Sequence, residues 1–214
     1  LCIVGASAGG LDALESLVKN IPTDSGYSWI IIQHLSPDHK SMMSELLSKH
    51  TSLDVKIIKD QLTFKANTIY VIPPGVMVKL NGSQFITQPK PDNKLTLPID
   101  VLLTSVAEQI PETYQYATAV ILSGSGSDGT RGCQLLNDQG GFIIAQTPNT
   151  AKFPSMPQSV IDTGIVDDVL APGEIPSRVV QLGKCEVATS THKENDECEQ
   201  SNANQTDARI DILD

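Results

Sequence analysis

The chain has 214 residues, of which 15 are basic and 25 acidic, so its formal net charge is −10. This length suits one domain with a tail, and the acidic balance argues against nucleic acid as a partner, because phosphate binding needs a basic surface. The sequence contains no apolar run of membrane length and no signal peptide, so membrane insertion is not expected.

The chain opens on an apolar run that leads into a glycine-rich turn, Gly5 to Gly10, with Ser7 at its centre. A helix-patterned stretch, residues 11–20, follows at once. This order predicts a strand–turn–helix unit. Such a turn directs backbone N–H groups toward negative charge at a helix N-terminus, and it exposes the serine as a nucleophile requires.

Strands and helices are predicted to alternate along the rest of the chain. The predicted strands cover residues 28–34, 53–58, 68–72, 77–80, 84–86, 117–122, 142–145 and 165–170. The predicted helices cover residues 37–52, 98–110, 130–139, 158–162 and 172–182. The polar stretch 87–97 and the proline-punctuated stretch through Pro157 are expected to be loops.

Strands that alternate with helices and lack polar alternation are typical of a parallel sheet covered on both faces. With right-handed crossovers, this pattern predicts a doubly wound α/β fold with a mostly parallel sheet. Asn81-Gly82, between two short strands, predicts an additional small antiparallel hairpin.

The last part of the chain differs in composition. From Lys184 onward the sequence has eight acids and three bases, so about half of the net charge lies there. We expect a domain over residues 1–183 and an acidic linker or tail over 184–214, in which residues 210–213 could add an edge strand. The chain starts inside a strand without a methionine, which suggests a piece excised from a longer protein.

The cysteines show no metal-ligand or CxxC spacing, so free thiols in a reducing compartment are expected. They are Cys2, Cys133, Cys185 and Cys198.

Three polar residues follow predicted parallel strands: Ser7, His34 and Asp128. Ligands of open parallel sheets bind beyond the carboxyl ends of the strands, so we expect these side chains to converge. Serine, histidine and aspartate are the parts of a triad in which histidine takes the serine proton and aspartate orients the imidazole. The other histidines are expected to be solvated: His39, His50 and His192.

Simpler interpretations stay open for each residue. Ser7 or Asp128 could be a helix N-cap, and His34 could be a surface residue. Nucleotide binding is also open, although the first turn reads G-x-x-x-G-G rather than G-x-G-x-x-G and lacks the P-loop lysine. The second glycine-rich turn, 123–129, follows a mid-chain strand and lacks a matching acid.

Several segments, taken in order, resemble the catalytic domain of the chemotaxis protein-glutamate methylesterases, the CheB family. They are Gly5–Gly10, Gln33-His34, Pro98–Val101, Ser123–Gly129, Ile144–Gln146 and Met156-Pro157. The resemblance covers roughly residues 1–183. It implies a doubly wound α/β serine hydrolase that cleaves glutamate methyl esters on the cytoplasmic helices of chemoreceptors, and that often deamidates glutamines there.

By this resemblance Ser7 is the nucleophile, His34 the general base and Asp128 the partner of the histidine. Backbone N–H groups near Ala8 and Ser125 would hold the oxyanion, and no metal or cofactor is implied. The family commonly has threonine at the position of Ala8 and methionine at that of Ser125, and backbone donors would survive both changes.

A basic stretch normally precedes the Pro98 helix in the family, whereas Lys94–Leu97 carries little charge. This suits CheB-like domains fused to methyltransferase and sensory domains. The partner implied is a methylated chemoreceptor or a similar signalling protein in the cytoplasm. A non-catalytic docking or regulatory module of a signalling protein remains the alternative hypothesis.

Overall fold

The computed structural model describes residues 1–33, 42–91, 96–110 and 117–183. Residues 1–179 form one compact unit, and of a second unit, 180–214, only the first four residues are described. The expected tail over 184–214, with its candidate edge strand, lies outside the described residues and stays a prediction.

The main sheet has seven strands. They are β1 (Cys2–Ala6), β2 (Ser28–Gln33), β3 (Asp54–Ile57), β4 (Thr68–Val71), β7 (Thr118–Ile121), β8 (Phe142–Gln146) and β9 (Asp168–Leu170). Their order across the sheet is β3-β4-β2-β1-β7-β8-β9, and every neighbouring pair is parallel. The predicted doubly wound parallel sheet is therefore confirmed.

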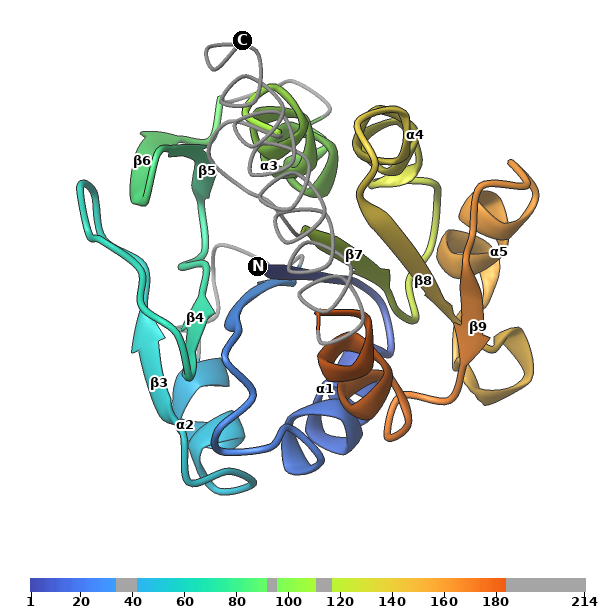
Figure 1. The fold of residues 1–214 in the computed structure, drawn as a ribbon, viewed down its shortest axis with the longest axis horizontal. Helices are drawn as coiled ribbons and strands as arrows, with labels where there is room; N and C mark the ends of the chain where they lie inside the picture. Colours follow the sequence, from blue (N-terminus) through green and yellow to red (C-terminus); the bar gives the residue numbers. More distant parts are fainter. Residues whose placement is uncertain (34–41, 92–95, 111–116, 184–214) are drawn as a thin grey trace, which may run out of the picture. The chain divides into compact units, whose positions relative to one another are not determined.

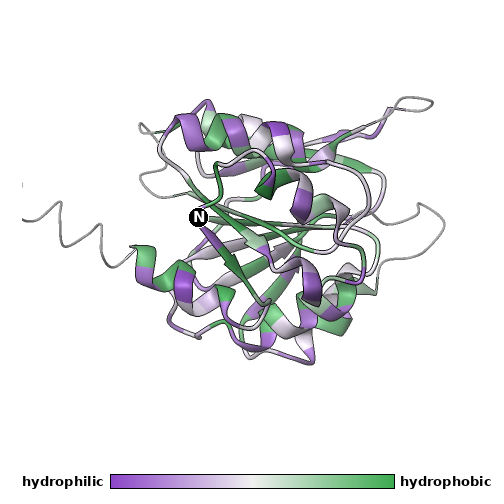
Figure 2. Cartoon of the chain, turned by 90° about the vertical axis from the view of Figure 1, so that its right-hand side faces the viewer, coloured by the Kyte–Doolittle hydropathy of each residue, from purple (hydrophilic) through white to green (hydrophobic). Residues whose placement is uncertain are grey.

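Helices cover both faces of this sheet (Figure 1). The helices are α1 (Gly10–Lys19), α2 (Met43–Ser48), α3 (Pro98–Ala107), α4 (Thr130–Asp138) and α5 (Ser155–Ile161), and residues 175–183 are also helical. In Figure 1, α1 and α2 lie on one side of the strands, and α3 and α4 lie on the other. Apolar residues line the strands between these layers (Figure 2), because a strand covered on both faces has no solvent side to make polar.

A two-stranded antiparallel sheet, β5 (Val76–Asn81) and β6 (Gln84–Pro89), packs on the α3 side. Its turn at Gly82 has a φ of 54°, which favours glycine, so the Asn81-Gly82 prediction of a hairpin is confirmed. The side chains of Val78, Leu80 and Phe85 are buried against the core that includes Leu102 and Val106 of α3.

Several predicted element bounds are wrong. Helix α3 ends at Ala107 rather than at 110, and strand β9 begins at Asp168 rather than at 165. Strand β6 runs on to Pro89, into the predicted loop, because its polar side chains suit a hairpin with one solvated face. Helix α5 begins at Ser155 rather than at 158 and contains Pro157 in its first turn, where no intrahelical N–H is needed. Helix α2 ends at Ser48, before the predicted end at 52, and residues 37–41 of that prediction lie outside the described segments.

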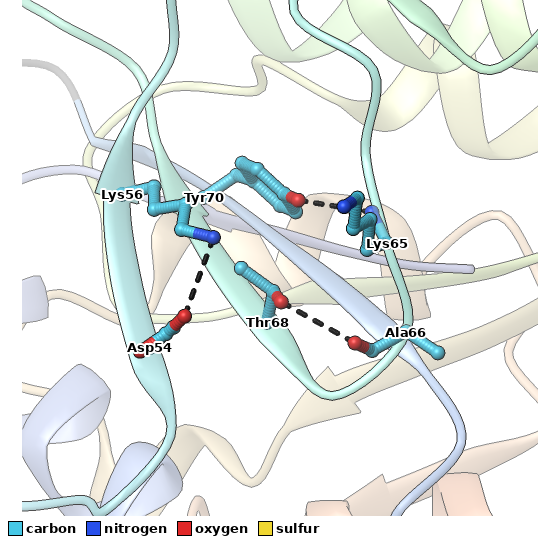
Figure 3. Close-up of polar contacts among 6 residues, drawn as sticks. All are labelled: Asp54, Lys56, Lys65, Ala66, Thr68 and Tyr70. Carbon is cyan, nitrogen blue, oxygen red and sulfur yellow. Dashed lines mark hydrogen bonds and ion pairs between the residues drawn. The ribbon is translucent and has the colours of Figure 1, made fainter.

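Strand β3 forms one edge of the sheet and carries a charged pair, and further polar contacts lie on and beside the neighbouring strand β4 (Figure 3). The Lys56 ammonium lies 3.3 Å from the Asp54 carboxylate, both largely exposed, and the Tyr70 hydroxyl of β4 accepts a 2.9 Å hydrogen bond from the Lys65 N–H. Charged side chains on an edge strand discourage pairing with another chain. An exposed ion pair adds little stability. These charges therefore protect the edge from pairing with another chain but do little to stabilise the sheet.

Candidate active site

The candidate site lies where the winding of the sheet changes direction. Strand β1 is hydrogen-bonded to β2 on one side and to β7 on the other, so the chain leaves β1 toward one edge and later returns to its other side. The loops after such neighbouring strands diverge and leave a crevice that commonly binds ligands. Ser7 follows β1, and the loop 123–129 that carries Asp128 follows β7.

The turn after β1 holds Ser7 by its backbone, and Ser7 is buried rather than exposed as the sequence predicted. The Ser7 N–H donates to the Ser123 carbonyl at 2.9 Å, and the Ser7 carbonyl accepts from the Gly10 N–H at 2.9 Å. The N-cap of α1 is Gly9, with a φ of 67° and no side-chain cap. Ser7 is therefore not the N-cap, and that simpler interpretation is wrong.

The Ser7 turn touches the loop after β7 without space for a side chain between them. A Cβ atom added to Gly124 would lie 2.9 Å from the Ser7 Cβ and 2.6 Å from the Met156 thioether. Real Cβ atoms essentially never approach their neighbours so closely, so a side chain at position 124 would have to displace Met156 or Ser7. The backbone of this loop thus borders Ser7 directly.

Ser123 connects three loops through one residue. Its hydroxyl donates to the Ala8 carbonyl at 2.9 Å and accepts from the Phe153 N–H at 3.0 Å, while its carbonyl accepts from Ser7. Its own N–H donates to the Gln146 side-chain oxygen at 2.8 Å. Ser123 and Gln146 are both almost completely buried, so these bonds are shielded from competing water.

Asp128 is buried and its carboxylate faces the first turn of α3. Oδ2 accepts from the Ile99 N–H at 3.1 Å, and Oδ1 accepts from the Asp100 N–H at 3.0 Å. Helix α4, which follows Asp128, has Gly129 as its N-cap with no side-chain cap. Asp128 therefore caps a different helix from the one it precedes, and the two backbone donors fix the orientation of its carboxylate.

Asp100, a residue that the sequence did not single out, completes this arrangement. Its Oδ1 atom accepts from the Gly132 N–H at 2.7 Å, in the first turn of α4. Burial raises the pKa of Asp100 above its usual value, an effect that the Gly132 N–H opposes and the nearby Asp128 charge increases.

The loop between Ser123 and Asp128 is tied to the start of α5. Ser155 Oγ donates to the Gly124 carbonyl at 3.1 Å and accepts from the Gly126 N–H at 3.3 Å. Ser125 lies between these anchored residues. The N–H groups of Ser125 and Ala8 have no acceptor among the described residues, so both are available to a ligand in the crevice.

The predicted general base, His34, lies outside the described residues, one position beyond Gln33 at the end of β2. The structure thus places Ser7 next to the loop that carries Asp128. Proximity to the histidine stays a prediction that follows from the position of β2 beside β1.

The first glycine-rich turn gives little support to a phosphate ligand. The Ser7 and Gly10 N–H groups, which a phosphate would need in the first glycine-rich turn, are engaged within the chain. Within the segments that the structure describes, no group of three or more metal-ligating side chains occurs. No helix in those segments is long and apolar enough to cross a membrane.

Sequence reasoning missed Ser123, Gln146 and Asp100 as parts of the site. A glutamine at the end of the apolar strand 142–145 was the available signal, since a polar side chain there needs a buried partner. Asp100 gave no comparable signal, because an acid in the first turn of a helix is common.

Several known proteins are similar in sequence to this chain. A chain of Rhodobacter capsulatus, named an uncharacterized 104.1 kDa protein, is 41% identical over 60% of this chain and 13% of its own length. A protein-glutamate methylesterase/protein-glutamine glutaminase of Desulfotalea psychrophila is 30% identical over 86% of this chain and 52% of its own length. The chain thus spans about half the length or less of these relatives.

A solved structure gives the same fold. The CheB methylesterase catalytic domain of Thermotoga maritima superposes with a TM-score of 0.75 at 28% identity, covering 85% of this chain and 97% of that one. The family model described as CheB methylesterase matches residues 2–179, which are nearly all of the described fold. The chain belongs to the CheB methylesterase family, a family of hydrolases.

Proposed function

We propose that this chain hydrolyses γ-methyl esters of glutamate side chains in a signalling protein, with Ser7 as the nucleophile. The observation that carries the proposal is the direct contact of the Ser7 turn with the loop that leads to Asp128, at the switch point of the sheet. Membership of the CheB methylesterase family supports the reaction class, and the names of relatives support the ester substrate.

The proposed mechanism has two acyl-transfer steps. Ser7 Oγ attacks the ester carbonyl while His34 takes the serine proton, and the tetrahedral intermediate then expels methoxide, which leaves as methanol with the proton from His34. Water attacks the acyl-enzyme with His34 again as the base, and the products are a glutamate carboxylate, a proton and the restored Ser7 hydroxyl. Asp128 orients the imidazole and stabilises its cation.

The oxyanion of each intermediate is proposed to lie between the N–H groups of Ala8 and Ser125. The N–H of Ser7 already donates to Ser123 and therefore does not contribute. Ala8 directly precedes the N-cap of α1, whose dipole favours a developing negative charge. Because both donors belong to backbone that is held by its neighbours, little reorganisation is needed during the reaction.

The same groups could deamidate glutamine, since an amide carbonyl presents the same electrophile with ammonia as the leaving group. Relatives that carry both activities in their names motivate this extension. The proposed partner is a methylated chemoreceptor or a related cytoplasmic signalling protein. Methyltransferase and sensory domains in the same polypeptide are a further proposal.

The test is methanol release from a methylated receptor fragment. We expect Ser7→Ala to lower the rate by at least about 10³-fold, because the residual rate would come only from binding and the oxyanion donors. A fluorophosphonate probe should label Ser7 in the wild type. Equal methanol release by the two proteins would exclude the mechanism, and absence of labelling would favour the non-catalytic docking module.

A further inference from the structure

An exposed aromatic ring lies against the turn that carries Ser7. Phe153 is 42% exposed, and it is the only aromatic among the large apolar residues that are exposed in the described segments. Its Cδ2 atom lies 2.9 Å from the point where a side chain on Gly9 would begin, two residues beyond Ser7. The ring therefore borders the candidate site and remains open to solvent.

Single exposed apolar residues are ordinary, but the backbone of this one is fixed on both sides. The Phe153 N–H donates to the Ser123 hydroxyl at 3.0 Å, and the Phe153 carbonyl accepts from the Gly124 N–H at 3.0 Å. Pro154 follows and restricts the Phe153 backbone further.

The anchors of this ring are the same residues that hold the nucleophile. Ser123 accepts the Ser7 N–H, and Gly124 packs against the Ser7 side chain. The backbone that carries the ring is thus tied to Ser7 through two shared neighbours. An aromatic side chain has few rotatable bonds, and on a backbone that is held before binding it loses less conformational entropy when a partner covers it, which makes it an effective anchor.

We propose that Phe153 selects the polypeptide that carries the ester, by packing against an apolar side chain of the substrate next to the modified glutamate. The inference rests on the proposed function and names its substrate class: an amphipathic segment that presents the ester and an apolar residue on one face. On a helix, residues three or four positions apart share such a face. A free amino-acid ester lacks the apolar neighbour and cannot use the ring in this way.

The test compares two substrates, a methylated receptor fragment and a small ester, N-acetyl-glutamate γ-methyl ester. Phe153→Ala should lower kcat/KM for the fragment about 10- to 100-fold, the range expected when an aromatic anchor is truncated. The loss for the small ester should be at least about tenfold smaller. The ratio of kcat/KM for the fragment to kcat/KM for the small ester therefore reports recognition of the polypeptide around the ester. Phe153→Glu keeps the backbone bonds and should change the ratio in the same direction.

Ile57 provides a matched control. It is 45% exposed on β3, at the edge of the sheet distant in strand order from β7 and β8, so Ile57→Ala should leave the ratio unchanged. Equal losses on both substrates in the Phe153 variants, or no loss on either, would overturn the inference. Failure of the proposed function is a different result, in which the wild type itself releases no methanol and the Ser7 probe does not react.

Discussion

Asp100 and Asp128 each cap the helix that the other one adjoins. Asp128, directly before α4, accepts from two N–H groups in the first turn of α3, and Asp100, in that turn, accepts from the Gly132 N–H in the first turn of α4. Each carboxylate satisfies backbone donors that would otherwise be buried without an acceptor. The two helix starts and the proposed triad aspartate are therefore one structural unit.

This unit predicts that the difference in stability between the wild type and Asp100→Asn depends on pH. Because burial raises the pKa of Asp100 in the folded state, the folded protein binds more protons than the unfolded chain between the usual and the raised pKa. Wild-type stability therefore falls as pH rises through that window, relative to a variant that cannot titrate. Between pH 4 and pH 7, the melting temperature of the variant should rise relative to that of the wild type. A difference in melting temperature that does not change with pH would contradict the prediction.

Asp128→Asn should separate catalysis from stability. An asparagine keeps one oxygen for the α3 cap and places an NH2 group opposite the other N–H, so the free energy of unfolding should fall by about 0.5–2 kcal/mol. The imidazole would lose its oriented anionic partner, so kcat should fall by about 10²–10⁴-fold. Urea unfolding and ester hydrolysis measure the two effects. A folded variant with wild-type kcat would remove Asp128 from the proposed triad.

Ser123 is predicted to position Ser7, the proposed nucleophile, without touching the substrate. Ser123→Ala removes the donor to the Ala8 carbonyl and the acceptor of the Phe153 N–H, and a buried polar group left without a partner costs about 1–3 kcal/mol. We expect kcat to fall more than KM rises, and Ser123→Thr, which keeps the hydroxyl, to recover most of the loss. If threonine is no better than alanine, the hydroxyl is not what matters at this position.

Gly124→Ala tests the close approach of the two loops. The added methyl group would meet the Met156 thioether, which can move, and the Ser7 Cβ, which is fixed by its own turn. The rate of Ser7 labelling by a fluorophosphonate should fall at least about tenfold, because a displacement of about 1 Å already weakens a reactive geometry strongly.

The control for this substitution is Gly140→Ala. Position 140 has a φ of 83° and open space around it, so alanine should cost about 1 kcal/mol of backbone strain without changing the labelling rate. Similar labelling losses in both variants would show that the effect is general destabilisation rather than displacement of Ser7.

Two cysteines should be inert in the folded protein. Cys2 in β1 and Cys133 in α4 are free thiols with no exposed surface, and burial raises the pKa of Cys2 to about 12 and also raises that of Cys133. The reactive thiolate is therefore scarce at neutral pH. Iodoacetamide followed by peptide mass spectrometry should find these two positions modified only after denaturation, and rapid native labelling would contradict their burial.

The sequence predicted the sheet well because its strands carry a strong local signal. Runs such as residues 119–122 and 30–32 are purely apolar, and this pattern has few explanations other than a doubly covered parallel strand. The position of Ser7 and of Asp128 after such strands followed from the same pattern. Element ends were predicted less well, since Pro157 signals a break although a first helical turn accepts it.

The residues that support the site could not be predicted from their neighbours in the sequence. The Ser123 hydroxyl and the Ala8 carbonyl are separated by 115 positions, and Asp100 and Gly132 by 32. Nothing in the neighbourhood of either residue in the sequence indicates its partner. Such pairs are fixed by the crossing of the chain back to β7, which is a property of the complete topology.

The hydrogen bonds of Ser123 also have a consequence for the order in which the chain folds. Its partners come from the turn after the first strand, the strand after α4 and the segment before α5. They therefore lie far apart along the chain, and no short segment contains all of them. Long loops must close before these bonds form, and their closure is entropically unfavourable until the central strands have paired. A chain emerging from the ribosome would therefore pair its central strands before the proposed nucleophile, Ser7, is positioned, and the proposed activity would require that residues near 153 had been synthesised and docked.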